Sequence, residues 1–286
     1  MSNYILTEYQ ISSGISLKQT LTIVLLADLH EKGTEEIVEL VKSVSPDLIC
    51  IAGDTFERSE KNKEKKHLEP QYENSCSRGD RMIHTFLMLM DHVFCLFTKK
   101  DKLSKRQQTK QTYEFLQKLR KIAPVYMSLG NHERYLTGED RRVLTDAGIV
   151  LLDNSAAGIK GVQIGGLSSV PDWEWLSQYT KMDGYKILLS HHPERFPKFS
   201  GIDLVLSGHA HGGQIRVKER GIYAPGQGLL PKYTRGIYEG ENGKMIVSAG
   251  CANTASIPRW GNPCEVVVIR MNPDIGYDKI FLGHID

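Results

Sequence analysis

Short apolar runs recur along the chain, and in its first half they alternate with segments of helical periodicity. The runs predict strands at Tyr4–Gln10, Leu21–Ala27, Leu48–Ala52, Val125–Leu129, Val150–Leu152, Gly161–Gly166, Ile187–Ser190, Leu204–Ser207, Gln214–Val217, Gly236–Tyr238, Lys244–Ser248 and Val266–Arg270. The periodic segments predict helices at Glu35–Lys42, Thr109–Lys121 and Arg141–Ala147. Because the second half is almost all strand and turn, we expect one α/β domain over residues 1–286, with two packed sheets flanked by helices.

Polar residues that can bind metals follow directly after some of these strands. The segments are Asp28-Leu29-His30, Gly53-Asp54, Gly130-Asn131-His132-Glu133, His191-His192 and Gly208-His209-Ala210-His211. Taken singly, each indicates no more than a hydrogen-bonded loop. Ligand sites in open α/β sheets form at the carboxyl ends of the strands, so the whole set predicts one shared site.

The donor atoms in these segments indicate which ions the site would take. Imidazole nitrogen with carboxylate and amide oxygen, without thiolate, favours manganese or iron and also permits zinc. A two-ion site needs a bridging carboxylate, with the ions about 3.5–4 Å apart, and Asp54 suits that position. Asn131 offers a neutral oxygen ligand, and His132 beside it can stay uncoordinated and handle protons.

These segments resemble the motifs of the calcineurin-like metallophosphoesterase superfamily, which read D-x-H, G-D, G-N-H-[D/E], a lone H and G-H-x-H. The resemblance extends from about Thr22 to Arg270. It implies a four-layer α-β-β-α sandwich of two mixed β-sheets flanked by helices. It also implies two metal ions and, as the nucleophile, a hydroxide that bridges them. The implied ligands are Asp28, His30, Asp54 and His211 for one ion, and Asp54, Asn131, His191 and His209 for the other.

The same resemblance implies roles for residues around the metals. His132 would protonate the leaving alkoxide or stabilise the transition state, and Glu133 would orient and charge it, at a position where many members have Asp. His192 is either a support for the neighbouring ligand or a bystander. Arg235 and Arg259 are the candidates for phosphate contact, and the alternative for each is a surface ion pair.

The substrate class is less closely defined than the metal chemistry. Segments in the second half resemble a branch with bacterial phosphodiesterases and pyrophosphatases that act on UDP-diacylglucosamine; they are Gly212-Gly213-Gln214, Pro225-Gly226-Gln227-Gly228, Lys232-Tyr233 and Pro258-Arg259 through Pro263-Cys264-Glu265. We therefore expect a phosphodiesterase or pyrophosphatase with a small or lipid-linked substrate. The alternatives are a phosphomonoester or phosphoprotein phosphatase, and a non-catalytic scaffold, although none of the expected ligands is lost.

Residues 57–108 form an insertion between the second and third motifs. A charged stretch through Arg81 precedes the very apolar Met82–Phe97, and basic residues continue to Lys110. One interpretation is a cap helix or self-association surface, and the other is peripheral membrane contact through residues 82–110. Pro171–Trp175 has two similar interpretations, as a lid over a base or sugar or as an ordinary helix.

Charge and cysteine content bound the partners and the compartment. The formal net charge is +2, and the basic patch at Lys99–Lys110 lacks interleaved aromatics, so we expect no specific nucleic-acid partner. The cysteines number five without paired spacing, and the N-terminal residues lack a basic signal region. We expect a cytoplasmic protein, or one peripheral at the membrane, with the oligomeric state left open.

Overall fold

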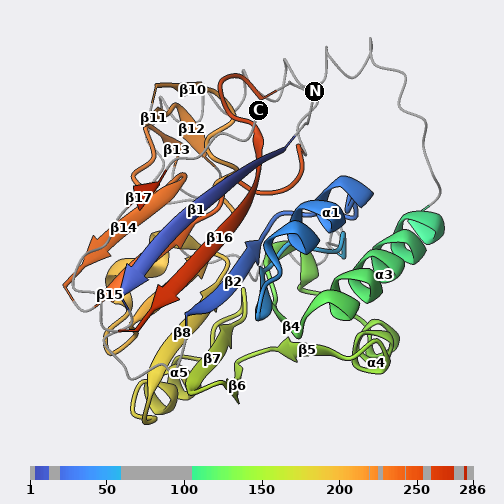
Figure 1. Ribbon diagram of the computed structural model, residues 1–286, viewed down its shortest axis with the longest axis horizontal. Coiled ribbons are helices and arrows are strands. Elements are labelled where there is room, and N and C mark those ends of the chain that lie inside the picture. Colours follow the sequence, from blue (N-terminus) through green and yellow to red (C-terminus); the bar gives the residue numbers. More distant parts are fainter. Residues whose placement is uncertain are drawn as a thin grey trace, which may run out of the picture.

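Two β-sheets form the centre of the protein (Figure 1). The computed structural model describes residues 4–12, 20–58, 105–218, 220–224, 228–241, 243–253, 259–273 and 280–281. Predictions that fall on residues 59–104, including the apolar Met82–Phe97, lie outside the described residues. The division into one domain with an insertion at 57–108 therefore stays a prediction.

The first sheet has seven strands in the order β17-β1-β16-β2-β3-β4-β5. Their bounds are β1 (Tyr4–Ser12), β2 (Leu21–Leu26), β3 (Leu48–Ala52), β4 (Val125–Ser128), β5 (Ile149–Leu152), β16 (Cys264–Asn272) and β17 (Ile280–Phe281). Strands β2 to β5 are parallel, whereas β16 runs antiparallel to β2 and parallel to β1. Every residue of β2 and β3 is buried, as expected for strands that are covered on both faces.

The second sheet has six strands in the order β14-β15-β9-β8-β7-β6. Their bounds are β6 (Ser155–Ile159), β7 (Val162–Leu167), β8 (Tyr185–Ser190), β9 (Leu204–Ser207), β14 (Gly236–Gly240) and β15 (Gly243–Val247). Strands β15, β9, β8 and β7 are parallel, and the outer strands are antiparallel to them. Two small hairpins stand apart from both sheets, β10 (Arg216–Val217) with β11 (Arg220–Gly221) and β12 (Tyr223–Ala224) with β13 (Gly228–Leu229).

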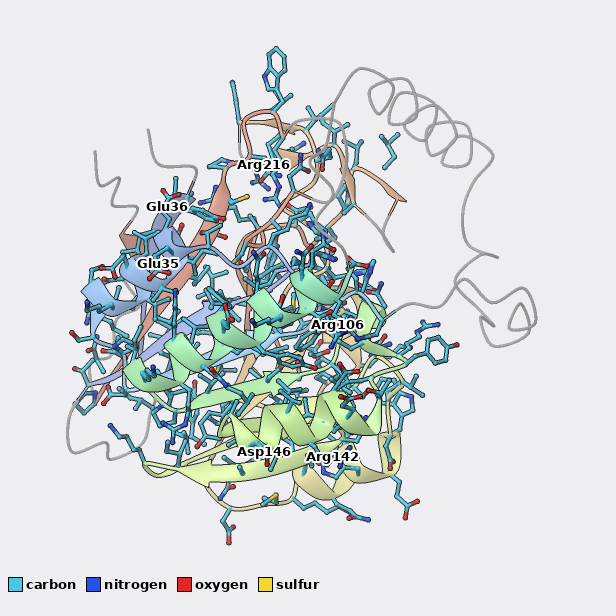
Figure 2. All side chains as sticks on the ribbon, turned by 90° about the vertical axis from the view of Figure 1, so that its right-hand side faces the viewer. Glu35, Glu36, Arg106, Arg142, Asp146 and Arg216 are labelled. Carbon is cyan, nitrogen blue, oxygen red and sulfur yellow. The ribbon has the colours of Figure 1, made fainter. Side chains whose placement is uncertain are left out.

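Helices cover the outer faces of the sheets. On the first sheet lie α1 (Glu35–Val44), α3 (Lys105–Ile122) and α4 (Gly138–Asp146), and on the second lie α5 (Trp173–Tyr179) and the 3-10 helix η4 (Pro193–Lys198). Figure 2 looks onto the first helical layer, where Arg106 marks α3 and Arg142 marks α4. No helix in the described part of the chain is long and apolar enough to cross a bilayer.

Three hydrophobic cores separate these layers. Side chains of β2 alternate between two of them, since Ile23 and Leu25 face the second sheet while Val24 and Leu26 face the helices. The third core lies between the second sheet and α5 with η4. Three cores between four layers confirm the predicted α-β-β-α sandwich.

Several predicted element boundaries need correction. Strand β1 extends to Ser12 rather than Gln10, and β17 pairs with its residues Glu8 and Tyr9. Strand β6 was not predicted, and α3 begins at Lys105 rather than Thr109. The Trp173–Trp175 segment forms the ordinary helix α5, in which Trp175 stacks on Tyr179 at a centroid distance of 5.3 Å.

Candidate metal centre

Five strand ends bring the predicted ligands together. Asp28 follows β2, Asp54 follows β3, Asn131 follows β4, His191 follows β8, and His209 with His211 follows β9. Within each sheet these strands run parallel, so their carboxyl ends lie at one edge of the sandwich. The sandwich therefore gathers donors that are far apart in the sequence.

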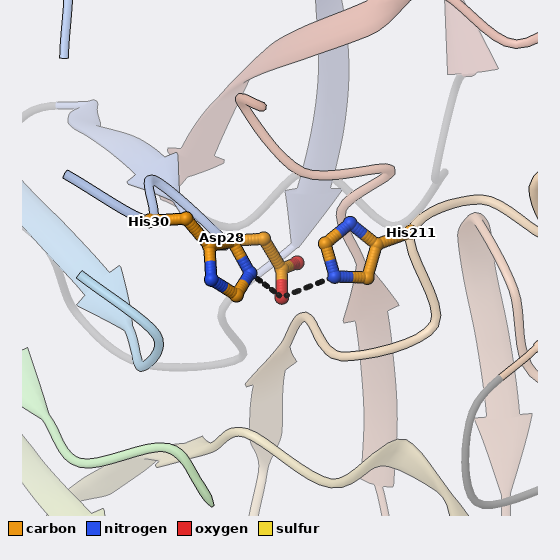
Figure 3. Close-up of side chains that lie close together, drawn as sticks. All are labelled: Asp28, His30 and His211. Carbon is orange, nitrogen blue, oxygen red and sulfur yellow. Dashed lines mark ion pairs between the residues drawn. The ribbon is translucent and has the colours of Figure 1, made fainter. Parts of the chain in front are cut away.

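Two buried carboxylates form the middle of the cluster. The Asp54 Oδ2 atom lies 3.0 Å from His191 Nε2 and 3.8 Å from His30 Nε2. Asp28 Oδ1 lies 3.5 Å from His211 Nε2 and 4.0 Å from His30 Nε2, and Figure 3 shows this carboxylate between the two rings. His30 thus faces both carboxylates, which makes it part of a continuous cluster.

The backbone at these positions is unusual. Five predicted ligands have positive φ angles, namely Asp28 (53°), His30 (46°), Asp54 (55°), His209 (69°) and His211 (47°). Residues other than glycine adopt this left-handed region at a cost, and such strain concentrates at functional sites. The fold holds these side chains in place against that cost.

Two glycines next to the ligands are required by close packing. A Cβ atom on Gly130 would lie 2.1 Å from Asp54 Oδ1, and one on Gly208 would lie 2.7 Å from Asp28 Oδ2. The glycines of these motifs therefore let one strand end approach the carboxylate of another.

Buried atoms without partners test whether the cluster suits a cation. Among the described residues, His30 Nε2, His191 Nε2 and Asn131 Oδ1 are buried and have no hydrogen-bond partner. The other ring nitrogen of each histidine is engaged, His191 Nδ1 with Ala52 O at 2.7 Å and His30 Nδ1 with Glu57 Oε1 at 2.6 Å. Donation from Nδ1 makes Nε2 the ring atom that faces the carboxylates, where a divalent metal could take the place of a proton, so these residues fit a divalent metal.

The electrostatics of the cluster also favour a cation. Burial lowers the pKa of His191, but the charge of Asp54 outweighs it and raises that pKa to about 10, so positive charge is favoured at this position. Burial lowers the pKa of His211 to about 4 and that of His209 well below its usual value. These two histidines are therefore neutral, the form that can bind a metal.

Two groups of donors match the two expected ions. Asp28, His30 and His211 place their donor atoms within 4.8 Å of one another, and so do Asp54, His191 and His209. Asn131 lies between Gly130, which packs on Asp54, and His132, whose backbone N–H donates to Asp54 Oδ1 at 3.0 Å. Six of the seven predicted ligands thus lie in two groups and Asn131 is next to them in the chain, and their roles as ligands stay predictions.

His132 lies beside these groups and is partly exposed. Its Nε2 atom is 3.8 Å from Asp54 Oδ2, and its Nδ1 atom is 2.8 Å from Glu57 Oε2. Burial lowers the pKa of His132, but the hydrogen bond with Glu57 and the charge of Asp54 outweigh it, so this pKa is raised. The ring can therefore carry a proton near neutral pH.

Glu133 has a set of backbone contacts beside its expected role, which stays a prediction. Its buried carboxylate accepts backbone N–H groups from Gly130 at 2.7 Å, Asp54 at 2.9 Å and Phe56 at 2.8 Å, and also from Thr55. Glu133 ends the turn η3 (Asn131–Glu133), and its charge contributes to the raised pKa of His132. Glu133 therefore holds two loops together, while the contact that orients His132 comes from Glu57.

Glu57 is the site residue that the sequence prediction missed. It begins the predicted insertion, although a carboxylate three positions after Asp54 is a usable signal. The next residue fixes the loop, since Arg58 Nη1 pairs with Glu31 at 2.9 Å and Nη2 with Asp140 at 3.1 Å. Its backbone N–H also donates to His132 O at 2.8 Å.

The two arginines proposed for phosphate contact have different environments. Arg235 Nε pairs at 2.8 Å with the fully buried Glu265, and Nη2 donates to Thr7 Oγ1 at 3.1 Å. The structure therefore gives Arg235 a structural ion pair and does not bring it into the cluster. Arg259 does reach the cluster, because Nη2 lies 3.2 Å from His211 Nδ1.

His192 lies against the cluster from the second sheet. Its Nδ1 atom is 3.1 Å from Glu194 Oε1, its Nε2 atom is 3.0 Å from Ser169 Oγ, and its ring centroid is 4.4 Å from that of His209. Its hydrogen bonds go to Glu194 and Ser169, neither of which is a predicted ligand, so both interpretations of His192 stay open.

Carboxylate, amide and imidazole donors at the ends of parallel strands in a four-layer sandwich suit a site for divalent metal ions. The chain belongs to the calcineurin-like phosphoesterase family, whose model matches residues 21–213. This confirms the superfamily that the motifs indicated.

Similar proteins carry the same family name. The uncharacterized metallophosphoesterase Cj0846 of Campylobacter jejuni is 26% identical over 90% of this chain, which spans 60% of that protein's length. The uncharacterized metallophosphoesterase YkoQ of Bacillus subtilis is 25% identical, over 88% of this chain and 84% of its own length. The crystal structure of TT1561 of Thermus thermophilus has a TM-score of 0.46 and 11% identity, and the match covers 81% of this chain and 90% of that one.

Proposed function

We propose that the protein is a phosphodiesterase or pyrophosphatase that works with two divalent ions, manganese foremost, with iron or zinc as alternatives. The observation that carries the proposal is a set of buried nitrogen and oxygen atoms that have no hydrogen-bond partner. Two of them, His30 Nε2 and His191 Nε2, face the carboxylate of Asp54. Asp28, His30 and His211 would hold one ion, Asn131, His191 and His209 the other, and Asp54 would contact both.

When bound, such a pair of ions supplies Lewis-acid stabilisation of the phosphoryl charge and an acidified water. The protein's own residues provide the rest of the chemistry. Arg259 lies beside His211, and its Nη1 and Nη2 atoms also donate to the carbonyls of Ala249 and Ala252. Its Nε atom is buried without a hydrogen-bond partner, and Arg259 stays the candidate for phosphate contact. His132 is partly exposed, with 32% of its side-chain surface accessible, so it can reach the leaving group.

His132 acts as the general acid in this proposal. The attacking water loses a proton to solvent as its oxygen bonds to phosphorus, and the bond from phosphorus to the leaving oxygen breaks. His132 Nε2 gives that oxygen a proton, which His132 regains from solvent. Glu57 holds the opposite ring nitrogen at 2.8 Å and so keeps the imidazolium in position. Glu57 also holds His30, so one carboxylate orients the acid and a predicted metal ligand together.

The substrate class is tested by comparing the rates at which the protein hydrolyses a phosphodiester and a phosphomonoester. The metal-free protein is supplemented with manganese and assayed on bis-p-nitrophenyl phosphate and on p-nitrophenyl phosphate. We expect hydrolysis of the diester, followed by activity on UDP-linked or cyclic-nucleotide substrates. Activity on the monoester alone would replace the diesterase proposal with a phosphomonoesterase.

A second arm tests whether the chain is a hydrolase at all. Manganese, iron and zinc are each supplied, and Asp54→Asn serves as the inactive control. Turnover that is equal in Asp54→Asn and the unaltered protein would show a contaminating enzyme. No turnover with any of these ions on either ester, despite bound metal, would favour the non-catalytic scaffold.

A further inference from the structure

Exposed apolar side chains gather at the small hairpins. Eight large apolar residues are exposed in the described part of the chain, and four of them lie here: Trp260 (75% exposed), Leu230 (67%), Val217 (60%) and Leu229 (41%). We call these four residues the hairpin patch. Large apolar side chains exposed together on a monomer indicate an interaction surface.

The backbone segments that carry the patch are direct neighbours. Ile222 N donates to Ile215 O at 2.9 Å, and Leu230 N donates to Ile222 O at 2.8 Å. On the other side, Ile215 forms a parallel bridge with Trp260, and Arg216 N donates to Trp260 O at 2.9 Å. The segments that carry the four exposed residues therefore lie side by side, and Arg216 marks this region in Figure 2.

Buried polar contacts fix this surface to the rest of the fold. The Arg216 side chain is buried, and its Nη1 atom donates to Gly212 O at 2.8 Å and to Thr234 Oγ1 at 3.0 Å. The hairpins are thus anchored from below by a charged side chain, while the apolar side chains face outward. The apolar side chains are therefore exposed on hairpins that are held in place by hydrogen bonds.

The charges around the patch are mostly positive. Lys218, Arg220 and Lys232 are exposed or half-exposed within the same hairpins and the turn that follows them. The other two basic residues of the stretch 214–235, Arg216 and Arg235, are held in contacts within the fold, and its one acidic residue is Glu219. A second copy of the chain would bring these like charges together, which disfavours self-association through this face. An anionic surface suits both the charges and the apolar side chains.

We propose that the hairpin patch binds the anionic surface of a lipid bilayer. Tryptophan and leucine enter the interface between headgroups and acyl chains, and neighbouring lysine and arginine are attracted to anionic headgroups. The protein then rests on the membrane without crossing it.

The short segment 259–262 connects the hairpin patch to the candidate metal centre. Trp260 follows Arg259, whose Nη2 atom lies 3.2 Å from His211 Nδ1, and Asn262 Nδ2 donates to His211 O at 2.7 Å. Docking at Trp260 would therefore bring the metal centre close to phosphate groups at the membrane surface. Binding by the patch does not depend on catalysis, so it can fail or succeed independently of the proposed hydrolysis.

A single-tryptophan protein reports on the patch directly. The chain has three tryptophans, and the Trp173→Phe, Trp175→Phe variant keeps only Trp260. We expect its emission to shift to shorter wavelength with vesicles of phosphatidylglycerol and phosphatidylcholine, and brominated acyl chains to quench it. Unchanged emission, with bound metal and melting temperature retained, would overturn the proposal.

Co-sedimentation with the same vesicles supplies matched variants. Leu230→Ser and Trp260→Ser should each weaken binding about tenfold, whereas Trp173→Ser, at an exposed tryptophan on α5, should bind like the unaltered protein. Phosphatidylcholine vesicles alone should bind much less. Equal binding of Leu230→Ser and the unaltered protein would overturn the proposal, as would a dimer in solution that Trp260→Ser abolishes.

Turnover of the soluble ester bis-p-nitrophenyl phosphate separates the two proposals. Leu230→Ser should retain it within about twofold, because the residue lies outside the metal centre. If the soluble ester is not hydrolysed but vesicles still bind, the proposed function fails and the membrane surface stands. If the ester is hydrolysed but no vesicle binds, the membrane proposal fails alone.

Discussion

The turn after β3 and the turn after β4 each contribute a predicted metal ligand and a glutamate, yet the two glutamates differ completely in their contacts. After β3, Glu57 extends into the cluster and binds the rings of His30 and His132. After β4, Glu133 turns under the cluster and accepts four backbone N–H groups. Proximity in sequence to His132 therefore does not determine which glutamate orients it.

The difference follows from the hydrogen-bonding needs of the backbone. Residues 54–56 leave their β-strand in an unusual conformation, so their N–H groups have no strand partner and need an acceptor. Glu133 satisfies them from the neighbouring turn. Glu57, with 37% of its side chain exposed, is not needed for that purpose and remains available to the site. Glu133 therefore satisfies the backbone of the two turns, whereas Glu57 holds the histidine rings of the candidate site.

The largest effect is expected at His132, which lies in the turn after β4 and binds Glu57 of the turn after β3. His132→Ala should lower turnover about 10²- to 10⁴-fold, because the leaving oxygen loses its proton donor. Metal content should be unchanged, since His132 is not a predicted ligand. Turnover is measured with manganese in excess, and metal content by mass spectrometry. Loss of metal together with turnover would instead make His132 a ligand.

Glu57→Gln should lower turnover about 10- to 100-fold, as found for residues that support metal ligands and catalytic histidines. Gln cannot hold both rings with a charged acceptor, so His132 and His30 lose their common anchor. In the background of His132→Ala, the same change should cost much less. Fully additive effects would contradict the coupling of Glu57 to His132.

Glu133→Gln should act on stability rather than chemistry. The amide places an N–H₂ group against backbone donors, and the loss should be about 3 kcal/mol in the free energy of unfolding, or roughly 6–12 °C in melting temperature. Glu57→Gln, measured by the same calorimetric scan, should lose much less. Equal melting temperatures for the two variants would remove the distinction between the two turns.

The pH dependence should change in a defined direction. Since the hydrogen bond with Glu57 raises the pKa of His132, the protonated acid persists to higher pH, and activity falls as the pH rises through that pKa. In Glu57→Gln the alkaline limb of kcat/KM should move to lower pH. An alkaline limb that stays in place in this variant would assign it to another group.

The stability of the protein in acid should depend on Glu57, whose pKa is lowered whereas that of His132 is raised. Burial raises the pKa of Glu57, but its hydrogen bonds with His132 and His30 outweigh it and lower the pKa from 4.5 to about 2. The stabilisation is therefore present above the unfolded pKa and is lost as the pH falls through the folded one. Acid unfolding of Glu57→Gln should lack this component, whereas an unchanged acid transition would contradict it.

The sequence was sufficient for the layers and for the predicted ligands, because each ligand follows closely after an apolar strand. It was not sufficient for the contacts between loops. The direction of Glu57 depends on the positive φ of Asp54, and the partner of Arg235 is Glu265, which comes close only when β16 lies beside β1. Such contacts arise from the packed sheets and have no local pattern.

The central claim is that these strand ends hold two ions that share Asp54. The most direct measurement is the manganese content of the reconstituted protein and of Asp54→Asn, with His132→Ala as a matched control. We predict about two ions per chain in the unaltered protein and in His132→Ala, and less than about one in Asp54→Asn. One ion per chain in the unaltered protein, or two in an active Asp54→Asn protein, would contradict the account.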